Sequence, residues 1–94
     1  MNILISADIL QKLSKKHKVS PEEVEQCFLN RRVKLLEDTR EDHKTNPATQ
    51  WFVAETDKRR KLKIVFMILD GEIHLKSAYE PTDDSFRIYK KYAF

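Results

Sequence analysis

The residues best suited to bind a ligand form a run of basic side chains that leads into an apolar stretch. The run spans positions 58–63 and contains Lys58, Arg59, Arg60, Lys61 and Lys63. Lys and Arg gathered on one surface are the electrostatic signature of phosphate-binding proteins. Basic residues also gather within 12–18, 31–34 and 87–91, where solvated helix and strand ends explain them adequately. The 58–63 run is therefore the first candidate for binding an anionic partner.

Histidine and cysteine give weaker signals. His17, His43, His74 and Cys27 share no spacing typical of metal ligands, and the single glycine is too few for a Gly-rich phosphate loop. We therefore expect no metal and no cofactor. Histidine titrates near neutral pH, so His74 can act as a general acid or base, although a packed strand histidine is more common. His17 is expected to border the first helix, and Cys27 to be a small buried residue.

Length and charge limit the class of protein. The chain has 94 residues and a formal net charge of +3, from 18 Lys plus Arg and 15 Asp plus Glu. We expect a single domain over residues 1–94 with, at most, a localised basic surface. The longest apolar run, residues 64–69, is far shorter than the roughly 20 residues of a membrane span. With no signal peptide visible, the expectation is a cytoplasmic protein without membrane contact.

Helices are expected at both ends of the chain. Ser6 is a plausible N-cap for a first helix. Ser20 and Glu23 form a capping box around a proline at the first helical position, so a second helix should begin at Pro21. After Pro81, Thr82 can cap a last helix.

Between these helices, four segments read as strands. Residues 33–38, 50–57, 60–69 and 72–79 are rich in β-branched, aromatic and aliphatic residues. The order helix, helix, strands, helix predicts an α+β domain with an antiparallel four-stranded sheet.

Asp70-Gly71 is the strongest local signal and predicts a two-residue hairpin with a type I′ turn. A regular register from this turn gives the pairs Leu69–Glu72, Ile68–Ile73, Phe66–Leu75, Ile64–Ser77 and Leu62–Tyr79. One face then holds the core residues Leu62, Ile64, Phe66, Ile68, Ile73, Leu75 and Tyr79. The other face holds Lys61, Lys63, Val65, Met67, His74, Lys76 and Ala78. Tyr79 falls on the core face unless a bulge turns it outward.

Short motifs along nearly the whole chain follow the order found in one known family. They are Lys16-His17-Lys18-Val19-Ser20 before Glu22-Glu23-Val24 and Phe28; Glu37-Asp38; Trp51-Phe52-Val53; Thr56-Asp57 with Arg60, Leu62 and Ile64-Val65-Phe66; and Ser77-Ala78, Thr82 and Arg87-Ile88-Tyr89. In these motifs the chain resembles the BrnT-like toxins of the RelE-like ribonuclease superfamily, as a divergent branch. The resemblance implies a sheet packed on helices, RNA cleavage without a metal, and an antitoxin protein as a tight-binding partner.

The resemblance also implies where catalysis would occur. Basic and hydroxyl side chains on the sheet would activate the 2′-hydroxyl of RNA and stabilise the phosphorane. Phosphate contacts are expected from Arg60, Lys63 and Lys76, and acid or base catalysis from His74 or Tyr79, with Glu80 as a further candidate base. Nucleic-acid binding is expected at Arg59, Arg60, Lys61 and Arg87.

A second hypothesis comes from the same comparison of motifs. Where BrnT-like sequences usually carry basic residues, this chain has Tyr79, Glu80, Asp83 and Asp84. Carboxylates at this point repel RNA phosphates. The alternative function is therefore a non-catalytic domain that retains the fold and binds a protein or nucleic acid through Val65, Met67 and the nearby lysines.

Overall fold

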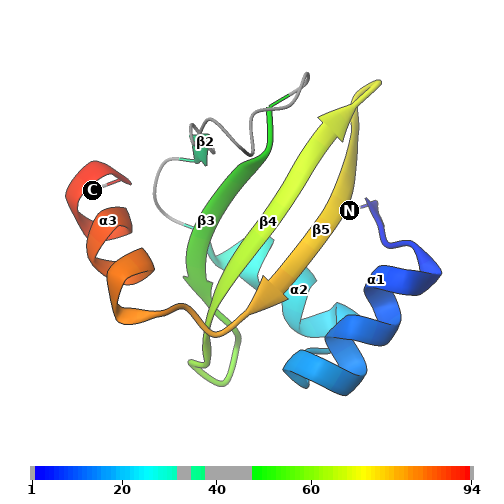
Figure 1. The fold of residues 1–94 in the computed structure, drawn as a ribbon, viewed down its shortest axis with the longest axis horizontal. Helices are drawn as coiled ribbons and strands as arrows, with labels where there is room; N and C mark the ends of the chain where they lie inside the picture. Colours follow the sequence, from blue (N-terminus) through cyan, green and yellow to red (C-terminus); the bar gives the residue numbers. More distant parts are fainter. Residues whose placement is uncertain (1, 32–34, 38–47, 94) are drawn as a thin grey trace.

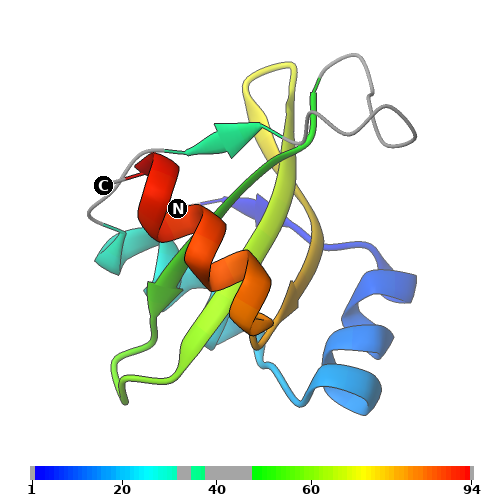
Figure 2. The same cartoon turned by 60° about the vertical axis from the view of Figure 1, so that its left-hand side comes forward.

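A computed structural model describes residues 2–31, 35–37 and 48–93, and it has an α+β fold, as predicted. The elements are β1 (Ile3–Leu4), α1 (Ala7–Lys12), the π-helical turn η1 (Leu13–His17), α2 (Pro21–Asn30), β2 (Leu36–Glu37), β3 (Gln50–Glu55), β4 (Lys61–Leu69), β5 (Glu72–Tyr79) and α3 (Asp83–Ala93). Helix α2 lies behind the sheet in Figure 1, α1 lies beside β5, and Figure 2 shows α3 crossing the opposite face.

The sheet differs from the expected antiparallel four-stranded one. Its strand order in the described residues is β1-β5-β4-β3-β2, and the two-residue β1 pairs in parallel with β5 through Ile3–Ile73 and Leu4–His74. The sequence does not predict β1, because two residues are too few to show the alternation of apolar and polar residues typical of a strand. Its parallel pairing with β5 defines it. Of the strand expected over 33–38, the structure describes residues 35–37, which include β2; the rest lies outside the described residues.

The predicted helix starts are confirmed by their caps. The Ser6 hydroxyl accepts a hydrogen bond from the Ile9 N–H at 3.3 Å. The Ser20 hydroxyl accepts from the Glu23 N–H at 3.2 Å, while the Ser20 N–H donates to Glu23 Oε1 at 3.0 Å. Thr82 Oγ1 accepts from the Ser85 N–H at 3.1 Å, and α3 begins one residue after Thr82. These side chains satisfy N–H groups that a helix start leaves unpaired.

The core lies between the sheet and the N-terminal helices. It contains Phe52, Leu62, Ile64, Phe66, Leu75 and Ala78 from the sheet and Leu13, Val19, Val24 and Cys27 from the helices and their connection. Phe28, Phe52 and Phe66 pack edge to face, with ring centroids 4.9 to 6.0 Å apart. Leu62, Ile64, Phe66 and Leu75 are thus buried as predicted, whereas Ile68, near the hairpin tip, is 41% exposed.

The β4–β5 hairpin begins in the predicted register and then departs from it. Both turn residues have positive φ, 53° at Asp70 and 79° at Gly71, as a type I′ turn requires. Ile68 faces Ile73 and Phe66 faces Leu75, but a shift between Val65 and Phe66 gives the pairs Val65–Ser77, Ile64–Ala78 and Lys63–Tyr79. The expected pairs Ile64–Ser77 and Leu62–Tyr79 are therefore wrong.

The register shift has a simple energetic reason. A regular hairpin places the hydroxyl of Ser77 in the core, whereas the shifted one places Ala78 there, with no exposure. Lys76 becomes the extra, exposed residue of the bulge. Because the face alternates along a strand, Tyr79 moves to the same face as Lys63. The assignment of Tyr79 to the core face is thus wrong, and the bulge turns it outward.

Lys18 provides a test of local backbone strain. It ends η1 in the left-handed region, with φ 56° and ψ 44°. Side chains with a Cβ are disfavoured there, whereas glycine is not. We expect Lys18→Gly to raise the free energy of unfolding by about 0.5–1 kcal/mol in a urea titration. Lys18→Ala, which removes the charge but keeps the Cβ, is the control; an equal gain from both changes would contradict backbone strain.

Candidate active site

Lys63 lies at the centre of a cluster built from four elements. Its Nζ is 4.4 Å from the centroid of the Trp51 ring and 5.8 Å from that of Tyr79. The ammonium group also donates to Ser85 Oγ at 3.5 Å. Lys63 comes from β4, Trp51 from β3, Tyr79 from β5 and Ser85 from the first turns of α3. The cluster therefore holds a cation against two aromatic rings on the sheet face that α3 crosses.

His17 reaches this cluster from the end of η1. The imidazole and phenol rings of His17 and Tyr79 have centroids 5.4 Å apart and are tilted by 35°. Burial holds the pKa of His17 below its usual value of 6.5, and the positive charges of Lys16 and Lys12 lower it further. The neutral imidazole is thus favoured. Our sequence-based expectation placed His17 only at the border of the first helix; its position between two lysines, directly before a capping box, was the available signal.

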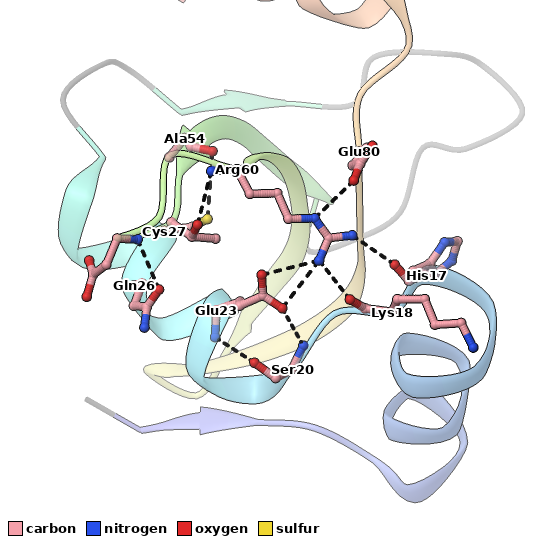
Figure 3. Close-up of polar contacts among 11 residues, drawn as sticks. His17, Lys18, Ser20, Glu23, Gln26, Cys27, Ala54, Arg60 and Glu80 are labelled. Atoms are coloured by element: carbon pink, nitrogen blue, oxygen red, sulfur yellow. Dashed lines mark hydrogen bonds and ion pairs between the residues drawn. The ribbon is translucent and has the colours of Figure 1, made fainter.

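Arg60 connects Glu80, the residue after β5, to the N-terminal helices (Figure 3). Its Nε donates to Glu80 Oε1 at 3.0 Å, and its Nη1 donates to both Glu23 carboxylate oxygens at 3.2 and 3.3 Å. Nη1 and Nη2 also donate to the backbone carbonyls of Lys18 at 2.7 Å and His17 at 3.1 Å. The guanidinium that we expected at an RNA phosphate is therefore bonded to protein acceptors and anchors the connection between η1 and α2.

Glu23 takes part in both the helix cap and this anchor. Burial tends to raise the pKa of its carboxyl, but hydrogen bonds from the Ser20 N–H and Arg60 outweigh burial and leave the pKa below its usual range. Glu80, the other carboxylate bound to Arg60, has a side chain that is 67% exposed. Glu23 is therefore the more strongly held partner.

Two expected catalytic residues lie apart from the Lys63 cluster. His74 pairs with Met67 and precedes Tyr79 by five positions, which is roughly 16 Å along a strand. Lys76 is the exposed bulge residue. The structure thus brings Lys63, Tyr79 and, through Arg60, Glu80 to one end of the hairpin, and leaves His74 and Lys76 outside this group.

The expected nucleic-acid-binding residues fall into two regions. Arg59 is exposed in the loop between β3 and β4, where it has a positive φ of 65°, and Lys61 is exposed at the start of β4. Arg87 lies on α3 and pairs with Asp84. Arg59 and Lys61 thus lie where β4 begins, and Arg87 lies two positions after Ser85 on α3.

Cys27 is fully buried in the core, and its Sγ donates to the Ala54 carbonyl oxygen at 3.7 Å. Burial raises the pKa of its thiol to about 12. Because the thiolate is the reactive form, iodoacetamide at pH 8 should leave Cys27 unmodified in the folded protein and alkylate it fully in urea, as measured by intact mass. Rapid alkylation without denaturant would contradict this burial.

Among the described residues, no group of three or more His, Cys, Asp or Glu side chains is placed to hold a metal ion. Within the same part of the chain, no helix has the length and hydrophobicity needed to cross a membrane. Comparisons with known protein families, with curated proteins and with solved structures found no match for this chain.

Proposed function

We propose that this protein is a toxin-like, metal-independent endoribonuclease that acts together with an antitoxin protein. One observation carries the proposal: Lys63 and Tyr79, two of the residues expected in the active site from the sequence, lie together on one sheet face. The bulge between Val65 and Phe66 gives Tyr79 this position, because it brings Tyr79 opposite Lys63.

The chemistry uses the nucleophile that RNA itself carries. The 2′-oxygen attacks the adjacent phosphorus, the bond from phosphorus to the 5′-oxygen breaks, and the products are a 2′,3′-cyclic phosphate and a 5′-hydroxyl. The Lys63 ammonium stabilises the negative charge of the phosphorane. The Tyr79 phenol donates a proton to the leaving 5′-oxygen. One side chain of the cluster thus stabilises the phosphorane, and another protonates the leaving group.

The neighbouring carboxylates have structural partners that limit their repulsion of RNA. Glu80 is paired with Arg60, and Asp84 with Arg87. Asp83 and Asp84 lie in the first turn of α3, where the helix dipole favours negative charge. Their presence therefore follows from the fold and does not by itself require a lost active site.

The alternative, a non-catalytic binding domain, is favoured by a different observation. Val65 and Met67 are only half-buried on the sheet face that also carries Lys63. Such a face suits a protein or nucleic-acid partner without any cleavage.

Induced expression distinguishes the two functions. Expressing the chain in cells should arrest growth and deplete cellular RNA, and Lys63→Ala should relieve both effects at an equal protein level. Co-expression of the protein encoded by the adjoining gene should also relieve the arrest if that protein is the antitoxin. Neither arrest nor RNA loss, with wild-type protein present and folded, would contradict the nuclease and favour the binding domain.

A further inference from the structure

We propose that His17 is the general base of this reaction and that Arg60 is the residue that positions it, an inference that rests on the proposed function. No sequence motif assigned either role.

The imidazole of His17 lies next to the proposed general acid. Its ring is in contact with the Tyr79 ring, at 5.4 Å between centroids, and Tyr79 in turn faces the Lys63 ammonium at 5.8 Å. A base that acts on the 2′-hydroxyl and an acid that acts on the 5′-oxygen must both come within hydrogen-bond reach of the same phosphate, with the charge-stabilising cation beside them. Of the three described histidine and cysteine side chains, His74, Cys27 and His17, only His17 meets this condition.

The backbone that carries His17 has an unusual and well-anchored form. η1 is a π-helical turn, and such turns are frequent at functional sites. Lys18 then follows in the left-handed region. Arg60 donates to the carbonyls of both residues, at 3.1 Å to His17 and 2.7 Å to Lys18.

Arg60 is itself held from two sides, as Figure 3 shows. Glu23 of α2 binds its Nη1, and Glu80, directly after β5, binds its Nε. Because Glu80 is the next residue after Tyr79, one guanidinium links the backbone of the base to the strand end that carries the acid. Arg60 acts through His17 and is a positioning residue.

The charges around the imidazole favour both its neutral form and an anionic substrate. The charges of Lys12 and Lys16 act on the imidazole, and the Tyr79 ring contacts it, with the Lys63 ammonium on Tyr79. Arg60 donates to the His17 carbonyl and is paired with Glu23 and Glu80. Burial and the charges of Lys16 and Lys12 lower the pKa of His17. A neutral imidazole can accept a proton at pH 7, and the exposed lysines beside it attract phosphate.

The proposed step balances without any further reactant. A ring nitrogen of His17 takes the proton of the 2′-hydroxyl as the 2′-oxygen bonds to phosphorus. The bond from phosphorus to the 5′-oxygen breaks, and the Tyr79 hydroxyl gives its proton to that oxygen. Return of the proton from the imidazolium to the phenolate, through solvent, restores both groups.

His17→Gln tests the base directly. With a short oligoribonucleotide as substrate, we expect kcat to fall by about 10²- to 10⁴-fold. Wild-type kcat/KM should rise with pH through a group that titrates below 6.5, and this acidic limb should be lost in His17→Gln. Ser14→Ala, an exposed change on the same turn, should leave the activity unchanged. Thermal unfolding establishes that each variant is folded.

The positioning role of Arg60 requires a readout other than activity. Arg60→Lys keeps the positive charge but loses the planar guanidinium, whose three nitrogens donate to separate acceptors. We therefore expect kcat to fall more than tenfold with little change in KM. The NMR signals of the His17 ring should also move toward those of an unstructured histidine. If Arg60→Lys fails to fold, Glu80→Gln, at an exposed side chain, should shift the same signals.

The outcomes separate the two proposals. Wild-type cleavage with an unchanged kcat and acidic limb in His17→Gln would overturn the assignment of the base and leave the nuclease standing. Unmoved His17 signals in the Arg60 and Glu80 variants would overturn the positioning role. If folded wild-type protein cleaves no RNA, the proposed function and this inference are both contradicted.

Discussion

Arg60→Ala is expected to lower the free energy of unfolding by about 2–3 kcal/mol. The Arg60 and Glu23 side chains are only 27% and 25% exposed. Removal of the guanidinium takes the Arg60 donor from the carbonyls of His17 and Lys18, and it removes the positive partner of the Glu23 carboxylate, which keeps its hydrogen bond from the Ser20 N–H. Partial exposure keeps the loss below that of a fully buried ion pair. Urea denaturation followed by circular dichroism measures it.

The two carboxylate partners provide matched controls. Glu23→Gln should be clearly destabilising, because it removes the negative charge that binds Arg60, although the amide oxygen still accepts from the Ser20 N–H. Glu80→Gln, at a side chain that is 67% exposed, should cost less than about 1 kcal/mol. A loss from Arg60→Ala no greater than that from Lys58→Ala, in the exposed loop nearby, would contradict the anchor.

The Glu23 contribution should also depend on pH. The pKa of Glu23 is lower in the folded protein than its usual value, because hydrogen bonds from Ser20 and Arg60 outweigh the opposing effect of burial. The stabilisation is therefore fully present above the unfolded-state pKa, near 4.3, and is lost as the pH falls through the lower folded-state pKa. Glu23→Gln should flatten this acid region of a stability–pH curve, and an unchanged curve would contradict the pairing.

Lys63→Met is expected to reduce RNA cleavage by about 10²- to 10³-fold while the protein stays folded. Methionine keeps the length and apolar contacts of the side chain against Trp51 but removes the charge that faces the phosphorane. Lys63→Arg should retain part of the activity. Initial rates on a fluorescent oligoribonucleotide provide the measurement.

The control for this variant must remove an equal charge elsewhere. Lys91→Met, in the last turn of α3, does so and should keep the rate within about twofold of wild type. Equal losses in both variants would mean that Lys63 acts only through the overall charge, which would remove it from the active site.

The parts of the fold that the sequence predicts correctly are those with local causes. Ser20 and Glu23 cap a helix three positions apart in the chain, and Asp70-Gly71 sets its turn from two adjacent residues. The strands that follow from these signals, β4 and β5, agree with the predicted ranges to within one residue. Such features need no knowledge of distant partners.

The parts that the sequence does not predict depend on packing between distant segments. Whether Ser77 or Ala78 enters the core is decided by packing against core residues from other elements, and this choice decides the face of Tyr79. The β1 pairing with β5 is only two residues long. The β4–β5 pairing therefore departs from the predicted register in the middle of the hairpin, although the turn is predicted correctly.

The candidate site was predicted only in part for the same reason. Arg60 lies 37 positions from Glu23 and 43 from His17, so its partners are not apparent from spacing. The basic run and the predicted hairpin single out Lys63, and the comparison of motifs singles out Tyr79. His17 has no such signal, because its contact with Tyr79 joins η1 to the end of β5.

Product analysis on a short oligoribonucleotide, in EDTA, tests the central claim most directly. Our account predicts fragments that end in 2′,3′-cyclic phosphate and 5′-hydroxyl, and no cleavage when the nucleotide 5′ of the scissile bond carries a 2′-O-methyl group. Lys63→Met should give little product from either substrate. Fragments with 5′-phosphate ends, cleavage of the 2′-O-methyl substrate, or no cleavage by folded wild-type protein would contradict it.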